Sequence, residues 1–188
     1  PRVTGAEPGI TTQALPEATP EELRAALVWN MRAGLNVAAL QCQFEPTLLT
    51  LGNYNALLLN HRDELAQSYA TLTKYFNRTS ANAKAGQTAL DQFGTRVYTG
   101  FSAVSAQLNF CLTAGDIGHE ALFVPRGGLG DLAELRMRSF RNALVPRGEQ
   151  QFRNVSYVPA IRFRPPADPK CWRKGIWNQK RCGEFSYR

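Results

Sequence analysis

Hydrophobic residues recur every three or four positions along most of this chain, which is the period of a helix that buries one face. The first such stripe runs from Leu23 to Cys42. Directly before it, Thr19 can cap a helix, Pro20 suits the first helical position, and Glu22 can complete a capping box. The pattern therefore predicts a first helix that begins after Thr19 and ends near Cys42.

Three more stripes of the same period follow. The second covers residues 51–76 and predicts one long helix, and the third covers residues 90–122. A shorter fourth helix is expected over 129–144. Short turns separate the stripes, so the simplest arrangement is an antiparallel bundle of three to four helices over residues 19–146.

The two ends of the chain lack this periodicity. Residues 1–18 are rich in Pro, Gly and Thr, and we expect them to form an extended arm. Residues 147–188 include four prolines between positions 159 and 169, which exclude a helix and any long central strand. Short extended segments are expected at 155–158 and 161–164. The predicted fold is therefore mainly α, with an extended N-terminal arm and an irregular, disulfide-pinned C-terminal tail.

Composition places the chain among ordinary globular proteins. Hydrophobic residues make up 44% of its 188 residues. No apolar run approaches the roughly 18 residues of a membrane span. The chain begins at Pro1 rather than Met, which we interpret as the removal of a leader segment.

The four cysteines indicate two disulfides, although they allow three pairings and could instead be buried thiols. No CxxC motif occurs, which disfavours a zinc site. The predicted helices bring Cys42 and Cys111 to the same end of the bundle, and Cys171 with Cys182 would close a short local loop. We therefore expect a protein exported to the periplasm, the extracellular space or the cell surface.

The net charge of +7 belongs to the tail. Residues 1–150 hold 13 basic and 13 acidic residues, whereas residues 151–188 hold nine basic and two acidic ones. Basic and aromatic side chains interleave there and can pair with phosphates or carboxylates while the rings cover apolar surface. We expect this tail to be the binding element, and the alternative is that it packs on its own bundle. The predicted binding residues are Arg162, Arg164, Lys170, Trp172, Arg173, Lys174, Trp177, Lys180 and Arg181.

Several segments of the predicted helices are distinctive. They include residues 29–44 (WNMRAGLNVAALQCQF), 53–55 (NYN) and 109–111 (NFC). Together they resemble a group of uncharacterised exported helical proteins of alphaproteobacteria, over about residues 22–145. The two bundle cysteines recur in that group, so the resemblance implies a Cys42–Cys111 bridge. The group has no assigned activity.

No arrangement of residues in the sequence predicts an enzyme, a cofactor or a metal site. Asp116, His119 and Glu120 share one helix face, but a bundle metal site needs carboxylates from other helices. His61 lies on a core stripe, where a hydrogen-bonded core histidine is the favoured interpretation. The glycines at 127–130 precede a helix and could offer amides to an anion, but we favour a plain linker.

These observations favour a non-enzymatic, extracytoplasmic structural or interaction subunit. We expect it to assemble with a protein partner, or as a homo-oligomer, through its arm and tail, because chain ends fray unless something holds them. The alternative is a module that binds an envelope polyanion, either lipopolysaccharide or an acidic glycan, through the tail; a nucleic acid is disfavoured. An enzyme would need a deep pocket lined by His61 or by Asp116, His119 and Glu120.

Overall fold

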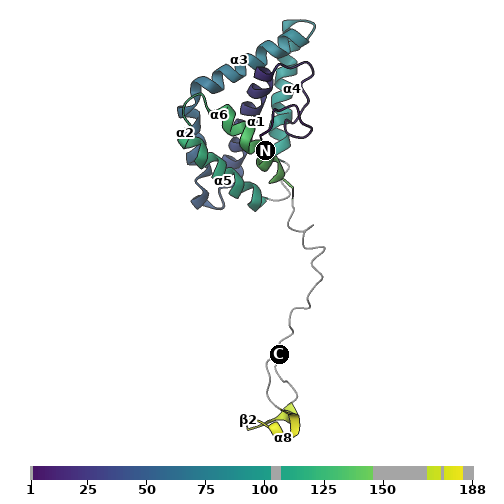
Figure 1. The fold of residues 1–188 in the computed structure, drawn as a ribbon, viewed down its shortest axis with the longest axis vertical. Helices are drawn as coiled ribbons and strands as arrows, with labels where there is room; N and C mark the ends of the chain where they lie inside the picture. Colours follow the sequence, from purple (N-terminus) through teal and green to yellow (C-terminus); the bar gives the residue numbers. More distant parts are fainter. Residues whose placement is uncertain (1, 103–106, 146–168, 175, 184–188) are drawn as a thin grey trace. The chain divides into compact units, whose positions relative to one another are not determined.

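The computed structural model describes residues 2–102, 107–145, 169–174 and 176–183. The chain forms two compact units, Pro1–Arg147 and Gly148–Arg188. The first is helical, and the second contains a small disulfide-closed loop (Figure 1). The prediction of a mainly α protein is confirmed. No helix among the described residues is long and apolar enough to cross a membrane.

The described residues of the helical unit form six α-helices and one 3₁₀ turn. The first helix begins as predicted, because the Thr19 amide donates to the Glu22 carboxylate at 2.8 Å and the Glu22 amide donates to the Thr19 hydroxyl at 3.3 Å. The elements are α1 (Pro20–Gln41), η1 (Pro46–Leu48), α2 (Thr50–Asn60), α3 (Arg62–Thr79), α4 (Ala83–Ser102), α5 (Gln107–Phe123) and α6 (Leu129–Asn142).

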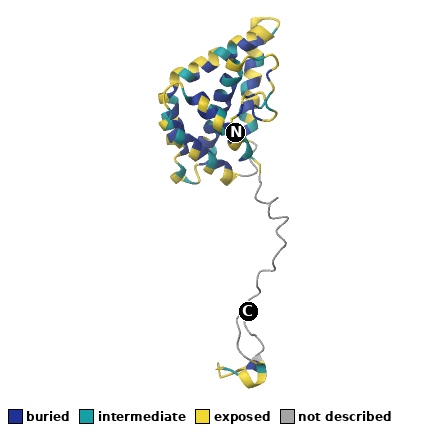
Figure 2. Cartoon of the chain, viewed as in Figure 1, coloured by how far each residue is buried: buried dark blue, intermediate teal, exposed yellow. Residues whose placement is uncertain are grey.

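Helix α1 lies at the centre of this unit and contacts each of α2 to α6 (Figure 1). Residues 25–28 are buried in succession, so protein surrounds the helix on more than one side. Small side chains permit this close packing. A Cβ atom on Gly34 would lie 2.6 Å from Phe140 and 2.8 Å from Phe101, two of the fully buried rings. Dark blue buried residues fill the centre of the unit in Figure 2.

The predicted second helix is divided in two at His61. The His61 amide closes α2 on the Leu57 carbonyl at 2.9 Å, and the His61 carbonyl opens α3 by accepting from the Leu65 amide at 3.0 Å. The third stripe also forms two helices, α4 and α5, on either side of residues 103–106, which lie outside the described part. Three residues of the predicted core stripes are exposed instead: Leu51, Tyr69 and Leu108.

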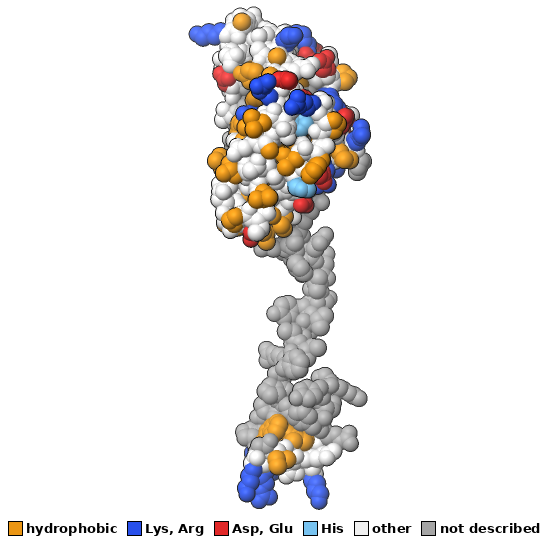
Figure 3. Space-filling model, turned by 90° about the vertical axis from the view of Figure 1, so that its left-hand side faces the viewer, with side chains coloured by type: hydrophobic (Ala, Val, Ile, Leu, Met, Phe, Trp, Pro, Cys, Tyr) orange, Lys and Arg blue, Asp and Glu red, His pale blue; other side chains and the backbone are white. Residues whose placement is uncertain are grey.

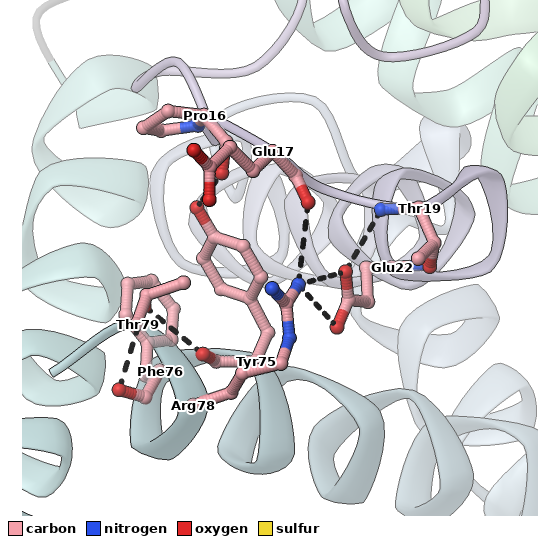
Figure 4. A network of polar contacts seen from close by, with 8 residues as sticks. All are labelled: Pro16, Glu17, Thr19, Glu22, Tyr75, Phe76, Arg78 and Thr79. Atoms are coloured by element: carbon pink, nitrogen blue, oxygen red, sulfur yellow. Dashed lines mark hydrogen bonds and ion pairs between the residues drawn. The ribbon is translucent and has the colours of Figure 1, made fainter.

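The N-terminal arm packs on its own helices, whereas we expected a neighbouring subunit to hold it. Its Val3, Ile10 and Leu15 side chains are buried in the main core. The Val3 amide donates to the Glu134 carbonyl at 2.8 Å, and Tyr75 donates to the Pro16 carbonyl at 2.9 Å (Figure 4). Burial of these apolar side chains explains why a segment without helix or strand is nevertheless held.

Both predicted disulfides are present. The Cys42–Cys111 bond joins α5 to the end of α1, and the Cys171–Cys182 bond closes the loop of the second unit. That loop contains η2 (Pro169–Cys171), β1 (Trp172–Arg173), β2 (Ile176–Trp177) and α8 (Gln179–Cys182). The extended segments expected at 155–158 and 161–164 lie outside the described residues.

Candidate functional site

The C-terminal loop is a short antiparallel hairpin closed by a disulfide. Trp172 pairs with Trp177 and Arg173 pairs with Ile176 across its two strands. Lys174 adopts a left-handed conformation, with φ at 50°, where the chain reverses. Below about 40 residues a chain has too little core to hold itself, so a staple such as Cys171–Cys182 is needed.

Contacts inside the loop fix the hairpin against α8. The Trp172 and Trp177 rings meet edge to face with their centroids 5.6 Å apart. Trp177 Nε1 donates to the Gly183 carbonyl at 2.9 Å, and the Asn178 amide donates to the Cys171 carbonyl at 2.8 Å. The indole rings therefore stabilise the loop as well as contributing to its surface.

The loop is strongly cationic. Residues 169–183 contain five basic residues and no acidic one. All five are exposed, and Figure 3 shows blue side chains projecting from the described part of the loop. These residues are Lys170, Arg173, Lys174, Lys180 and Arg181. Because like charges so close together repel, the arrangement favours binding of an anion that neutralises them.

An open hollow of about 420 Å³ lies on this loop. Arg173, Lys174 and Lys180 line it together with Ile176 and Trp177. A guanidinium can hold a phosphate or carboxylate through two parallel hydrogen bonds, and the ammonium groups add point charges. The Trp177 ring and the exposed Ile176 side chain offer apolar contact to the part of the ligand that carries the anionic group. The hollow therefore suits an anionic group attached to a less polar body.

Four of the nine predicted binding residues line this hollow, and a fifth meets the ring of Trp177 edge to face. Lys170 and Arg181 are exposed elsewhere on the loop, whereas Arg162 and Arg164 lie outside the described residues. Those five residues are Trp172, Arg173, Lys174, Trp177 and Lys180. The sequence identified the basic and aromatic residues, but it did not identify Ile176, which is 73% exposed and lines the hollow.

A second cluster, in the helical unit, binds an anion of the chain itself. The Glu64 carboxylate accepts from the Leu129 amide at 3.0 Å and from the Gly130 amide at 2.8 Å. Glu64 thereby caps the N-terminus of α6, where free amides and the helix dipole favour negative charge. Residues 127–130 are consequently more than the plain linker that we predicted.

His61 is part of the same cluster, as a hydrogen-bonded core histidine. Its side chain is fully buried, and Nε2 lies 3.0 Å from the Ala121 carbonyl oxygen. Nδ1 lies 3.6 Å from the Glu64 carboxylate. A cavity of about 490 Å³ between α1, α3 and the turn before α6 reaches both side chains. The groups facing it include Arg24 and Arg126 as well as Glu21 and Asp63, so its charge is mixed.

The predicted Asp116, His119 and Glu120 face does not form a joint site. Glu120 pairs with Arg136 at 3.3 Å, and the His119 ring lies 5.1 Å from the Phe123 ring. Within the described part of the chain, no three His, Cys, Asp or Glu residues come close enough together to hold a metal ion.

No family model matches this chain, and comparisons with curated proteins and with solved structures found no match. The resemblance to exported alphaproteobacterial proteins therefore stays a prediction.

Proposed function

We propose that this chain is a non-enzymatic, extracytoplasmic interaction protein that assembles with a neighbouring protein chain through its C-terminal loop. The observation that carries this proposal is the placement of Arg173, Lys174 and Lys180 around one hollow, in a loop that has no acidic residue. Two disulfides support an oxidising compartment such as the periplasm or the cell surface.

The N-terminal arm has a different role in this proposal from the one that its sequence suggested. Its apolar side chains are buried against its own helices, so they are not available to a neighbour. The arm therefore stabilises the helical unit, and in this proposal the C-terminal loop alone binds the neighbouring chain.

Glu64 and His61, two titratable groups of the cavity in the helical unit, support a non-enzymatic protein because their contacts stabilise the fold. Both Glu64 oxygens bind amides of α6, and His61 Nε2 contacts a backbone carbonyl. His61 Nδ1 has no hydrogen-bond partner, but the side chain is fully buried and this nitrogen lies 3.6 Å from the Glu64 carboxylate, so its lone pair faces a group of the chain itself rather than a substrate.

A second candidate function is the binding of an envelope polyanion, either lipopolysaccharide or an acidic glycan. The specific observation in its favour is the hollow itself, whose cations surround Trp177 and Ile176. Such a surface can pair with a phosphate or carboxylate while the ring contacts a sugar or an acyl group. A protein partner would present the same chemistry as exposed Asp and Glu side chains.

One experiment separates these candidates. A photo-crosslinking amino acid replaces Ile176 in the full chain, which is expressed in cells that make the native protein, and the adduct is identified by mass. A discrete protein adduct supports the first function, and a lipopolysaccharide or glycan adduct supports the second. Absence of any adduct contradicts both.

Charge-matched variants test whether the loop acts by its cations. The triple variant Arg173→Ala, Lys174→Ala, Lys180→Ala should lose the adduct. The triple variant Arg62→Ala, Lys74→Ala, Lys84→Ala removes the same charge from exposed positions of the helical unit and should keep it. Equal loss in both variants would indicate attraction by net charge alone.

A further inference from the structure

The helical unit carries an apolar face at the end where Cys42 and Cys111 are joined. Six large hydrophobic side chains there are between 46% and 71% exposed. We call this set the apolar face; its residues are Leu40, Phe44, Leu49, Leu51, Leu108 and Leu112. Figure 3 shows orange side chains, separated by white ones, over the lower part of the helical unit, where few blue or red side chains lie. The largest apolar patch on a protein surface is often a functional site.

Contacts between two distant segments make this face continuous. The disulfide joins Cys42 to Cys111, and Gln107 Nε2 donates to the Gln41 carbonyl at 3.2 Å. Farther along α5, Gly115 approaches η1 so closely that a Cβ atom would lie 3.3 Å from the Leu48 carbonyl oxygen. The exposed side chains of residues 40–51 and of α5 thus belong to one rigid surface.

The same region is almost free of charge. Between Arg32 and Arg62 the only Asp, Glu, Lys or Arg is Glu45, and between Arg96 and Asp116 there is none. Depletion of charge distinguishes the core of a protein–protein interface from ordinary surface, and homodimer interfaces are the most apolar.

Leu49 supplies an independent indication. Its backbone is left-handed, with φ at 50° and ψ at 26°, a conformation that costs energy for a bulky side chain. Glycine would fit there without strain, yet the chain places a leucine that is 62% exposed. The strained backbone directs an apolar side chain to the surface, where it adds little to the core of its own unit.

We propose that the apolar face binds a second copy of this chain in a two-fold symmetric dimer. Such an interface brings the same patch of each copy together, so it must be self-complementary. Apart from Glu45, the segments that carry this face are uncharged, so it meets that condition without opposite charges, whereas contact through the cationic tails of two +7 chains would be repulsive.

The size and composition of the face agree with this occupant. Helix α5 has 17 residues and a length of about 25 Å, and two helices side by side are about 20 Å wide. Even this full area of about 500 Å² on each copy would bury only about 1,000 Å² in total, which is below the standard size of a stable interface, so we expect a weak dimer. A membrane surface fits less well, because residues 40–51 and 107–115 contain no Lys, Arg, Trp or Tyr of the kind that anchors a helix at the interface.

This dimer uses a different surface from the C-terminal loop, so its test is independent of the proposed function. Sedimentation velocity of the full chain from about 1 to about 100 µM should show a mass that rises from one to two times 20.9 kDa. Leu112→Glu should raise the dimer dissociation constant at least about tenfold, because it buries an unpaired charge. Leu135→Glu is the matched control, since Leu135 is 52% exposed on α6, outside the face.

Two further variants separate the dimer from stability and from the loop. Leu49→Gly should weaken the dimer while the Tm of the diluted chain stays equal or rises, because glycine relieves the strain. The loop variant Arg173→Ala, Lys174→Ala, Lys180→Ala should dimerise like the unaltered chain. If the chain stays monomeric up to about 100 µM, the proposal is wrong, even if the face is found to bind lipid vesicles or the chain's own tail. A dimer that Leu135→Glu weakens as much as Leu112→Glu also overturns it.

Discussion

Arg78 and Glu22 join the last turn of α3 to the first turn of α1: Arg78 Nη2 donates to both Glu22 carboxylate oxygens, at 2.8 and 3.1 Å (Figure 4). The same nitrogen donates to the Glu17 carbonyl at 3.3 Å, at the end of the N-terminal arm. The Arg78 guanidinium also lies 5.4 Å from the centre of the Tyr75 ring. One side chain thus connects two helices and the arm.

This contact makes stability depend on pH. Burial acts to raise the pKa of Glu22, but hydrogen bonds from Thr19 and Arg78 and the charge of Arg78 outweigh it, so the pKa is lowered from 4.5. A carboxyl group whose pKa is lower in the folded state stabilises the fold above its unfolded pKa, and this contribution is lost as the pH falls through the folded pKa. Acidification below pH 4.5 should therefore destabilise the helical unit.

Replacing Glu22 by Gln isolates this effect. We expect Glu22→Gln to lower the free energy of unfolding by about 1 kcal/mol at pH 7, since Arg78 is half exposed and the pair is partly screened. The variant should also lose less stability than the unaltered chain between pH 6 and pH 3 in urea denaturation. Identical pH profiles for the two proteins would show that the pair contributes nothing.

Glu64 is expected to stabilise the fold by capping α6 from another helix. Glu64→Ala leaves the Leu129 and Gly130 amides without their acceptor, and loss of a helix cap costs about 1–2 kcal/mol. Thermal denaturation should show a lower Tm than for Asp63→Ala, which alters a neighbouring side chain that is 91% exposed. Equal Tm values in the two variants would mean that water replaces the cap without cost.

Structural features that depend on residues close together in the chain can be predicted from the sequence. The Thr19 and Glu22 capping box lies three residues apart, and the Cys171–Cys182 loop is 11 residues long, so local spacing determines both. The core position of His61 also follows from helical periodicity.

Other features depend on partners that are far away in the chain. Glu64 binds amides 65 and 66 residues later, and no local pattern reveals that pairing. The break at His61 is not visible in the hydrophobic stripe, because only this one residue separates α2 from α3. Leu108 lies on a core stripe, but it is 58% exposed because α5 buries the adjacent side. An exposed leucine and a buried leucine have the same appearance in a sequence.

The two disulfides should act on different properties. The Cys42–Cys111 bond closes a separation of 69 residues, for which loop-closure entropy gives about 4 kcal/mol. Replacing both cysteines by Ser should therefore lower the Tm of the helical unit strongly. The Cys171→Ser, Cys182→Ser pair lies in the other unit and should leave that Tm unchanged while it abolishes crosslinking from position 176. A fall in the Tm of the helical unit in this second variant would show that the C-terminal loop also stabilises that unit.

Two glycines in helix interiors should respond to alanine with opposite signs. Alanine is favoured over glycine in a helix by about 1 kcal/mol. At Gly94 of α4 nothing lies within 4 Å of a new Cβ atom, so Gly94→Ala should raise the free energy of unfolding by about 0.5–1 kcal/mol. At Gly34 of α1 the methyl group would press on two fully buried Phe rings, and overpacking costs about 1–3 kcal/mol.

The clash at Gly34 outweighs the gain in helix propensity because the new methyl group would meet ring carbons of Phe101 and Phe140. These rings are fully buried and cannot move aside as the end of a flexible side chain could. Gly34→Ala should therefore destabilise the protein in chemical denaturation, whereas Gly94→Ala stabilises it. The double variant Gly34→Ala, Phe101→Leu tests whether overpacking is the cause. Replacing one ring by the smaller leucine side chain should recover part of the lost free energy of unfolding. Stabilisation by both single alanine variants would mean that α1 is less tightly enclosed by α4 and α6 than the structure shows.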